Sequence, residues 1–335
     1  MTEKRAPLLS VQDLSIALGT APVPIIDKVS FELGRGETLC VVGESGCGKS
    51  LTALALMGLM ASPPLRRVSG RAVFDGEDLF AMPADVLRKT RGGKMAMIFQ
   101  EPMTSLNPTI RIGEQIAESV RVHQGVSAEA ARQRALDMLQ KVRIPAAEQR
   151  LDEFPHQLSG GMRQRAMIAM ALANDPALLI ADEPTTALDV TIQAQILDLM
   201  RQLAAETAAS FILITHDLGV VAEMADKVAV MYAGRIIEFG SAEQIFNDPQ
   251  HPYTLGLMNS MPALAGARGR LLTIPGMVPS PHHMPEGCRF APRCAFSGAD
   301  CAAPPPLSSL SEGHTVACWR APLEANLQDL AANVA

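Results

Sequence analysis

A glycine-rich segment near the start of the chain separates a short apolar run from an apolar helical pattern. The run is Thr38–Val42, the helical pattern covers residues 49–60, and the segment between them matches G-x-x-x-x-G-K-[ST]. Glycines let a backbone turn so tightly that successive N–H groups face a phosphate, and the helix N-terminus adds partial positive charge. The order strand, loop, helix therefore predicts a phosphate-binding loop in an α/β fold. The loop comprises Gly43, Glu44, Ser45, Gly46, Cys47, Gly48, Lys49 and Ser50.

The side chains of this loop predict binding of ATP and Mg²⁺. We expect Lys49 to neutralise the β- and γ-phosphates and the Ser50 hydroxyl to bind Mg²⁺. A chance match to the motif in 335 residues is about a one-in-a-hundred event at ordinary glycine and lysine frequencies.

A second apolar run, at residues 178–181, ends in two carboxylates, Asp182 and Glu183. Because neighbouring strand residues point to opposite faces, the two acids should have different roles. Asp182 fits the Mg²⁺ shell, and Glu183 fits the base that polarises the attacking water. Most strands that end in Asp-Glu are merely solvated there, so the prediction depends on the phosphate-binding loop.

Two further polar residues end apolar runs. His216 follows the run at 211–215, where a γ-phosphate sensor would be needed, and Gln100 follows the run at 95–99. The Gln100 amide could contact both Mg²⁺ and the lytic water. The alternative for both residues is an ordinary polar strand end.

Residues 158–165, LSGGMRQR, predict a second anion-binding helix N-terminus. One nucleotide seldom needs two such sites from one chain. Ser159, Gly160 and Gly161 are therefore expected to contact ATP held by another subunit. An ordinary serine-capped helix is the alternative.

These motifs, in this order, resemble those of ABC transporter ATPase subunits over about residues 8–240. The match includes the Walker A loop, Gln100, LSGGMRQR, Asp182-Glu183, a D-loop ending at Asp189, and His216. The resemblance implies a P-loop NTPase core with an antiparallel β layer and a helical subdomain at about residues 101–165. It also implies that Leu51 and Asp189 contact nucleotide, although Leu51 replaces a hydroxyl residue often seen there.

Several stretches are similar to the dipeptide/oligopeptide (peptide/nickel-type) importer subfamily. They are GESGCGKS, the block at 99–118, HPYT at 251–254, IPGMVPS at 274–280 and GCRFAPRC at 287–294. The resemblance implies an ATPase that powers import, paired with a second and different ATPase subunit, two membrane permeases and a solute-binding protein. Its place would be peripheral, at the cytoplasmic face of the inner membrane. The alternative is a non-transport ABC ATPase that acts on nucleic acid or ribosomes.

Composition agrees with a globular protein that reaches the membrane through partners. The net charge is −6, which does not favour nucleic acid as a partner. The N-terminus has no apolar signal region, and no apolar run approaches the roughly 20 residues of a membrane-spanning helix. Only 4% of residues are aromatic, and Leu18 stands nearest to the place where many ABC ATPases stack adenine on an aromatic ring.

The last 95 residues, 241–335, hold 12 of the 24 prolines and four of the six cysteines. This composition predicts a loop-rich extension that does not continue the sheet. Four thiolates suit zinc or an iron–sulfur cluster, but the spacing lacks the short knuckles usual for zinc, and unrelated cysteines are equally compatible with it. The subfamily resemblance implies a [4Fe-4S] cluster, with Zn²⁺ as the alternative. The ligands would be Cys288, Cys294, Cys301 and Cys318.

Overall fold

The chain divides into two compact units in a computed structural model. The first consists mainly of Glu77–Ile214 together with Gly34–Glu37, and the second consists of Leu9–Leu33, Thr38–Gly76 and Thr215–Ala335. The structure describes residues 6–21, 23–100, 105–185, 189–207, 209–260 and 274–323.

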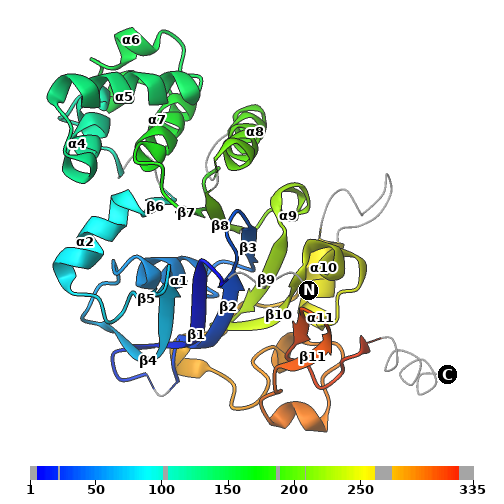
Figure 1. Cartoon of the computed structure of the whole chain (residues 1–335). Coiled ribbons are helices and arrows are strands. Elements are labelled where there is room, and N and C mark those ends of the chain that lie inside the picture. Colours follow the sequence, from blue (N-terminus) through cyan, green and yellow to red (C-terminus); the bar gives the residue numbers. More distant parts are fainter. Residues whose placement is uncertain are drawn as a thin grey trace. The chain divides into compact units, whose positions relative to one another are not determined.

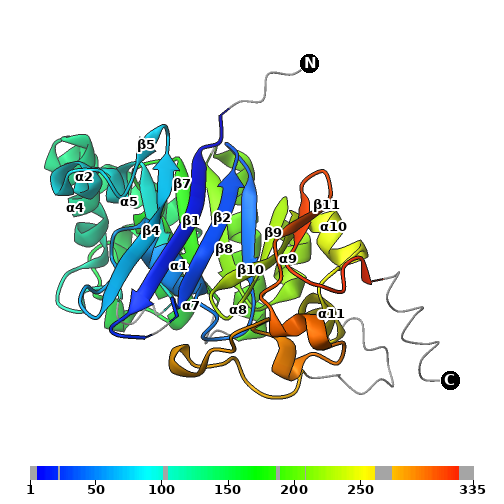
Figure 2. The ribbon, with the colours of Figure 1, turned by 90° about the horizontal axis from the view of Figure 1, so that it is seen from below.

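The predicted antiparallel layer is confirmed in the second unit. Strand β1 (Leu9–Leu18) pairs antiparallel with β2 (Ile26–Leu33) and with β4 (Leu65–Phe74) (Figure 2). Strand β4 ends at Phe74. Asp75 and Gly76 follow it with φ of 50° and 87°, the left-handed geometry that a tight hairpin turn requires.

The second unit also carries the strand and helix on either side of the phosphate-binding loop. Strand β3 (Thr38–Val42) is fully buried and pairs parallel with β9 (Lys227–Tyr232). Helix α1 (Lys49–Leu56) is shorter than predicted. Gly58 stands just beyond it at φ 62°, a conformation that commonly ends a helix. Helix α9 (Leu218–Met224) precedes β9.

The C-terminal region continues the sheet, so the prediction that it would not is wrong. Strand β10 (Arg235–Ser241) pairs with β9, and β12 (His314–Val316) pairs antiparallel with β10. Strand β11 (Ser308–Ser311) then pairs with β12. Without this hairpin β10 would expose a row of unpaired backbone groups, which explains why a short return strand is added. The other elements are α10 (Ala242–Asn247), α11 (Pro252–Asn259) and the 3-10 helices η2 (Pro281–His283), η3 (Ala291–Arg293) and η4 (Ala299–Ala302).

A buried carboxylate fastens this C-terminal region to β10. Glu238 has no exposed surface. Its carboxylate accepts hydrogen bonds from the backbone N–H groups of Gln250 and His251, at 2.6 and 2.9 Å, and lies 3.0 Å from Nε2 of His314. One side chain of β10 therefore ties together β12 and the segment that leads into α11, because a buried acceptor of this kind is costly to leave unpaired.

The first unit contains three parallel strands and most of the helices. Strands β6 (Met95–Ile98), β7 (Leu178–Asp182) and β8 (Ser210–Thr215) run parallel, with β7 between the other two. All side chains of β7 and β8 are buried, as predicted for strands covered on both faces. The short β5 (Glu77–Asp78) and the kinked helix α2 (Ala84–Gly93) precede them.

The helical insertion predicted between β6 and β7 is present. It contains α4 (Ile112–Gln124), α5 (Ala128–Lys141), α6 (Ala147–Arg150), the 3-10 helix η1 (Pro155–Gln157) and α7 (Gly160–Leu172), which lie together in Figure 1. Helix α8 (Val190–Glu206) follows β7. Across the described residues, no helix is both long enough and apolar enough to cross a bilayer.

Candidate nucleotide-binding site

The phosphate-binding loop joins β3 to α1, so its predicted structural context is confirmed. Gly43, Gly46 and Gly48 all have positive φ, at 149°, 80° and 105°. A Cβ atom on Gly43 would stand 2.2 Å from the carbonyl oxygen of Met231, whereas nothing lies within 4 Å of a Cβ atom on Gly46. The loop is therefore packed tightly against the end of β9 at Gly43 and is open at Gly46, the shape that a phosphate cradle needs.

The lysine of this loop is buried within the loop itself. Lys49 is 5% exposed, and its Nζ donates to the carbonyl oxygens of Gly43 and Glu44, at 2.7 and 3.1 Å. Burial raises the pKa of the neighbouring Cys47 thiol, which favours its neutral form. Ser50 and Leu51 lie half-buried in the first turn of α1, while Ser45 is exposed.

Glu44 is held by two residues from the C-terminal region, a contact that sequence reasoning missed. Its backbone N–H donates to the hydroxyl of Tyr253 at 2.8 Å. Its carboxylate accepts two hydrogen bonds from the guanidinium of Arg293, at 2.7 and 2.9 Å. Tyr253 lies in HPYT and Arg293 in GCRFAPRC, which marked the subfamily but gave no sign of this partner.

Asp182 and Glu183 differ in burial, since Asp182 is buried and Glu183 is half-buried. Asp182 ends β7 and is 4% exposed. Glu183 lies just beyond the strand at φ 44°, and its N–H donates to the carbonyl oxygen of Ile214 at 2.9 Å. Glu183 is therefore a non-glycine residue in the left-handed backbone region. Such a conformation in a non-glycine residue costs energy and is often found at functional sites.

The structure brings Gln100 and Glu183 together. Gln100 follows β6, and its Nε2 donates to Oε2 of Glu183 at 3.4 Å. Since β6 and β7 are parallel neighbours, the residues beyond their carboxyl ends meet at one edge of the sheet. A carboxylate and an amide at this edge can orient a water molecule, and a carboxylate and an amide oxygen are ligand types that suit Mg²⁺.

Ser159 and Asp189 each cap a helix. The Ser159 hydroxyl accepts from the N–H of Met162 at the start of α7, and the Asp189 carboxylate accepts from the N–H of Ile192 at the start of α8. Ser159, Gly160 and Asp189 are exposed. A Cβ atom on Gly161 would stand 2.8 Å from Cγ2 of Ile192, so glycine at 161 lets α7 approach α8 closely. The D-loop residues Thr186, Ala187 and Leu188 lie outside the described residues.

His216 follows β8 directly and is exposed, while Leu18, at the end of β1, is half-buried. The structure thus places the predicted motifs where strands end or helices begin, the positions from which side chains and N–H groups can reach a bound phosphate.

Comparison with known proteins decides the family. The family model described as ABC transporter matches residues 26–186, and the model described as the C-terminal region of oligopeptide/dipeptide transporters matches residues 237–301. OppD of Haemophilus influenzae, an oligopeptide transport ATP-binding protein, is 49% identical over 96% of this chain and 99% of its own length. A Brucella abortus protein, named for a proposed role as a peptide import ATP-binding protein, is 51% identical over 94% of this chain and 95% of its own.

This chain belongs to the ABC transporter ATP-binding subunits. Among solved structures, the ATP-binding cassette MJ0796, a dimer bound to ADP and Pi in a post-hydrolysis state, matches with a TM-score of 0.62 and 26% identity. That match covers 70% of this chain and 98% of the other. The cassette cbiO1 of Clostridium perfringens, part of an ABC transporter complex, matches with a TM-score of 0.61 and 26% identity over 75% of this chain and 95% of the other. The predicted cassette fold is confirmed.

The metal site predicted for the C-terminal region of this ABC subunit is not found among the described residues. They contain no group of three or more His, Cys, Asp or Glu side chains arranged to hold a metal ion. Two of the four cysteines are nevertheless neighbours: the Cys288 N–H donates to the Cys301 carbonyl oxygen at 2.9 Å. Burial, together with the neighbouring thiols, raises the pKa of Cys294 and of Cys318 to about 11.

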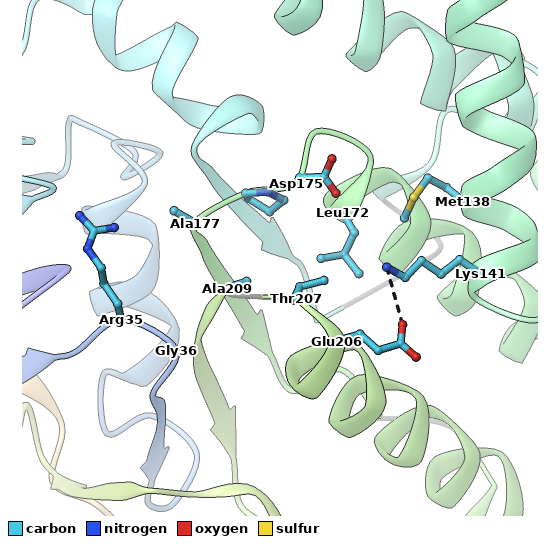
Figure 3. A pocket seen from close by; sticks show the side chains of 11 residues that line it. Arg35, Gly36, Met138, Lys141, Leu172, Asp175, Ala177, Glu206, Thr207 and Ala209 are labelled. Atoms are coloured by element: carbon cyan, nitrogen blue, oxygen red, sulfur yellow. Dashed lines mark ion pairs between the residues drawn. The ribbon is translucent and has the colours of Figure 1, made fainter.

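A pocket of about 750 Å³ lies elsewhere in the first unit (Figure 3). Its lining includes Ala177 and Ala209, which precede β7 and β8, so it lies near the amino ends of these strands. Asp182 and Glu183 stand at the carboxyl end of β7. Lys141 of α5 and Glu206 of α8 face each other across the pocket with 3.8 Å between Nζ and Oε2. The pocket therefore lies toward the opposite end of β7 from Asp182 and Glu183.

Proposed function

We propose that this chain is the ATP-hydrolysing subunit that powers an importer of di- or oligopeptides or related small solutes. The observation that carries the proposal is the near full-length similarity to ATP-binding proteins of peptide import, which includes the C-terminal region as well as the cassette. Residues 241–335 are proposed to be the extension specific to this subfamily, attached to a cassette at residues 1–240.

Each motif is assigned one step of ATP hydrolysis. Lys49 and the loop N–H groups bind the phosphates. Ser50, Asp182 and Gln100 would hold Mg²⁺, which supplies charge neutralisation at the phosphates when bound. Glu183 acts as the base toward the attacking water, and the 3.4 Å contact with Gln100 supports a shared water-orienting role. His216 senses the γ-phosphate.

A second ATPase subunit is proposed to complete each site. ATP bound to the phosphate-binding loop of one subunit would contact Ser159 and Gly161 of the other, and Asp189 would lie at the same interface. Ser159 is exposed at the N-terminus of α7, which supports this role. The free N–H groups and the partial positive charge of a helix N-terminus favour binding of an anion. Closure of the pair would reach two membrane permeases through the region around residues 100–118. The subunit would thus lie peripherally at the cytoplasmic face of the membrane.

Reconstitution of the complete complex in liposomes tests the proposed function. The chain is purified with the permeases and the second ATPase subunit encoded beside it, and ATP hydrolysis is measured with a peptide-loaded solute-binding protein. We expect peptide-dependent stimulation of hydrolysis together with peptide uptake. Hydrolysis that responds to nucleic acid or ribosomes, and not to the loaded binding protein, would support the non-transport alternative.

We further propose that Cys288, Cys294, Cys301 and Cys318 hold a [4Fe-4S] cluster. The 2.9 Å hydrogen bond from the Cys288 N–H to the Cys301 carbonyl oxygen supports the assignment, since it brings two of the four residues together. Purification under strictly anaerobic conditions, followed by iron, sulfide and zinc analysis, should yield brown protein with acid-labile sulfide. A colourless protein with stoichiometric zinc would favour Zn²⁺, and a metal-free protein would remove the cluster from the account.

A further inference from the structure

Glu44, the second residue of the phosphate-binding loop, is contacted by two side chains of the C-terminal region as well as by groups of its own loop. Lys49 Nζ donates to its carbonyl oxygen, its N–H donates to the Tyr253 hydroxyl, and its carboxylate pairs with Arg293. All of these residues belong to the second compact unit. A residue of the nucleotide site is thus fixed by side chains more than 200 positions away in the sequence.

Arg293 is held in one orientation. Its Nε donates to the carbonyl oxygen of Pro275 at 2.7 Å, and its guanidinium lies 5.7 Å from the ring centre of Tyr232 and 5.9 Å from that of Phe290. The side chain is 6% exposed, while that of Glu44 is 28% exposed. The pair is therefore a two-pronged and largely desolvated contact, the geometry in which an arginine–carboxylate bond is strongest.

Tyr253 is fixed as firmly as Arg293. It has no exposed surface, and its ring lies 4.8 Å from that of Tyr232 and 5.4 Å from that of Phe290, measured between centres. His251 caps the first turn of α11 through Nδ1, which accepts the Tyr253 N–H at 2.9 Å. The hydroxyl that receives the loop N–H therefore projects from a rigid aromatic cluster.

We propose that Arg293 and Tyr253 are positioning residues for ATP, through which the C-terminal region sets the charge and the shape of the phosphate-binding loop. The proposal rests on the assignment of residues 43–50 as the ATP site. ATP brings several negative charges to this loop, and a Glu44 carboxylate without an ion-pair partner would repel them. Arg293 cancels that charge, and Tyr253 fixes the backbone beside the carbonyl group that Lys49 contacts.

The test separates charge from structure by removing the two partners singly and together. ATP affinity is measured by titration calorimetry in the absence of Mg²⁺ for the wild type, Arg293→Gln, Glu44→Gln and the double variant. Arg293→Gln should weaken ATP binding about tenfold, because it leaves the Glu44 carboxylate uncompensated beside the phosphates. The double variant should bind within about threefold of the wild type, since the repelling charge is gone.

Ionic strength gives a second readout that a purely structural role would not change. The loss of ATP affinity in Arg293→Gln should become smaller at high salt, because screening weakens repulsion between charges. In hydrolysis assays Arg293→Gln should raise KM for ATP and leave kcat within about twofold of the wild type. The Arg293–Glu44 contact acts on ATP binding, before the chemical step. Tyr253→Phe keeps the aromatic packing and should weaken ATP binding by a smaller factor, about threefold, for loss of one neutral hydrogen bond.

Two controls make the outcomes unambiguous. Arg320→Gln changes another arginine of the C-terminal region, one whose guanidinium lies 3.7 Å from Asp300 and donates to the carbonyl oxygen of Phe296, and it should bind ATP as the wild type does. Lys49→Ala tests the ATP site itself: if it binds ATP normally, the proposed site is wrong.

If Lys49→Ala loses ATP binding while Arg293→Gln binds ATP normally, the positioning role fails and the ATP site stands. The same conclusion follows if the double variant binds ATP as weakly as Arg293→Gln. If Arg293→Gln lowers the unfolding temperature, the charge-exchanged Glu44→Arg/Arg293→Glu variant must recover ATP binding for the proposal to hold.

Discussion

Replacing Glu183 with glutamine should lower steady-state ATP hydrolysis at least about 100-fold, the loss usual for removal of a general base. ATP binding should survive, because the amide keeps the size of the carboxylate and no phosphate contact is assigned to it. With hydrolysis blocked and binding intact, the ATP-bound pair of ATPase subunits should accumulate. The measurement is phosphate release under multiple turnover, together with gel filtration of the two ATPase subunits in ATP and Mg²⁺.

Glu148→Gln is a matched control, since Glu148 is exposed on α6, in the helical insertion of the same unit. It should hydrolyse ATP at the wild-type rate and give no long-lived closed pair. Rapid steady-state hydrolysis by Glu183→Gln would contradict the assignment of the base.

Replacing Lys49 with alanine should weaken ATP binding about 10- to 100-fold, on the basis of roughly 1.5–3 kcal/mol for a hydrogen bond to a charged group. The Nζ group donates to the carbonyl oxygens of Gly43 and Glu44, so the change also removes two contacts that shape the loop. Titration with ATP measures the effect. Thermal unfolding in the absence of nucleotide separates loss of loop structure from loss of phosphate contact.

Lys89→Ala removes an equal charge from an exposed position on α2 and should leave ATP affinity unchanged. If Lys49→Ala binds ATP as tightly as Lys89→Ala does, the phosphate-binding loop is not the ATP site. If both variants lose affinity equally, the net charge of the protein, rather than a specific contact, controls binding.

The parts of the fold predicted well are those whose signal is local. Strands β3, β7 and β8 are short apolar runs that are buried throughout, and a run of that kind has few other structures available to it. The phosphate-binding loop was predictable for the same reason, because its glycines, Lys49 and the flanking strand and helix are contiguous in sequence.

The parts that escaped prediction depend on residues far apart in the chain. The Glu44 carboxylate meets Arg293 across 249 residues, and no local pattern marks either residue as a partner of the other. Strand β12 has only three residues, too few to show an alternation of apolar and polar side chains. The sequence therefore did not predict that the sheet continues beyond β10. The left-handed conformation of Glu183 was likewise not predictable, because the residue is not a glycine.

The C-terminal region therefore contacts the rest of the second unit both at the sheet and at the phosphate-binding loop. Glu238 and the β10–β12 pairing fix it to the sheet, and Tyr253 with Arg293 reaches the phosphate-binding loop. Arg289 adds a buried ion pair with Asp27, at 2.7 Å, and donates to the carbonyl oxygen of Ala233. These contacts provide a physical route by which a change in the cysteine-bearing segment could reach bound nucleotide.

The proposed mechanism requires that each ATP be shared between two ATPase subunits. The most direct test is the structure of the assembled transporter carrying Glu183→Gln, determined with ATP and Mg²⁺. Hydrogen bonds from the Ser159 hydroxyl and the Gly161 N–H to the γ-phosphate of ATP held by the neighbouring subunit are the predicted result. ATP enclosed by one subunit alone, with Ser159 directed into solvent, would contradict the shared site.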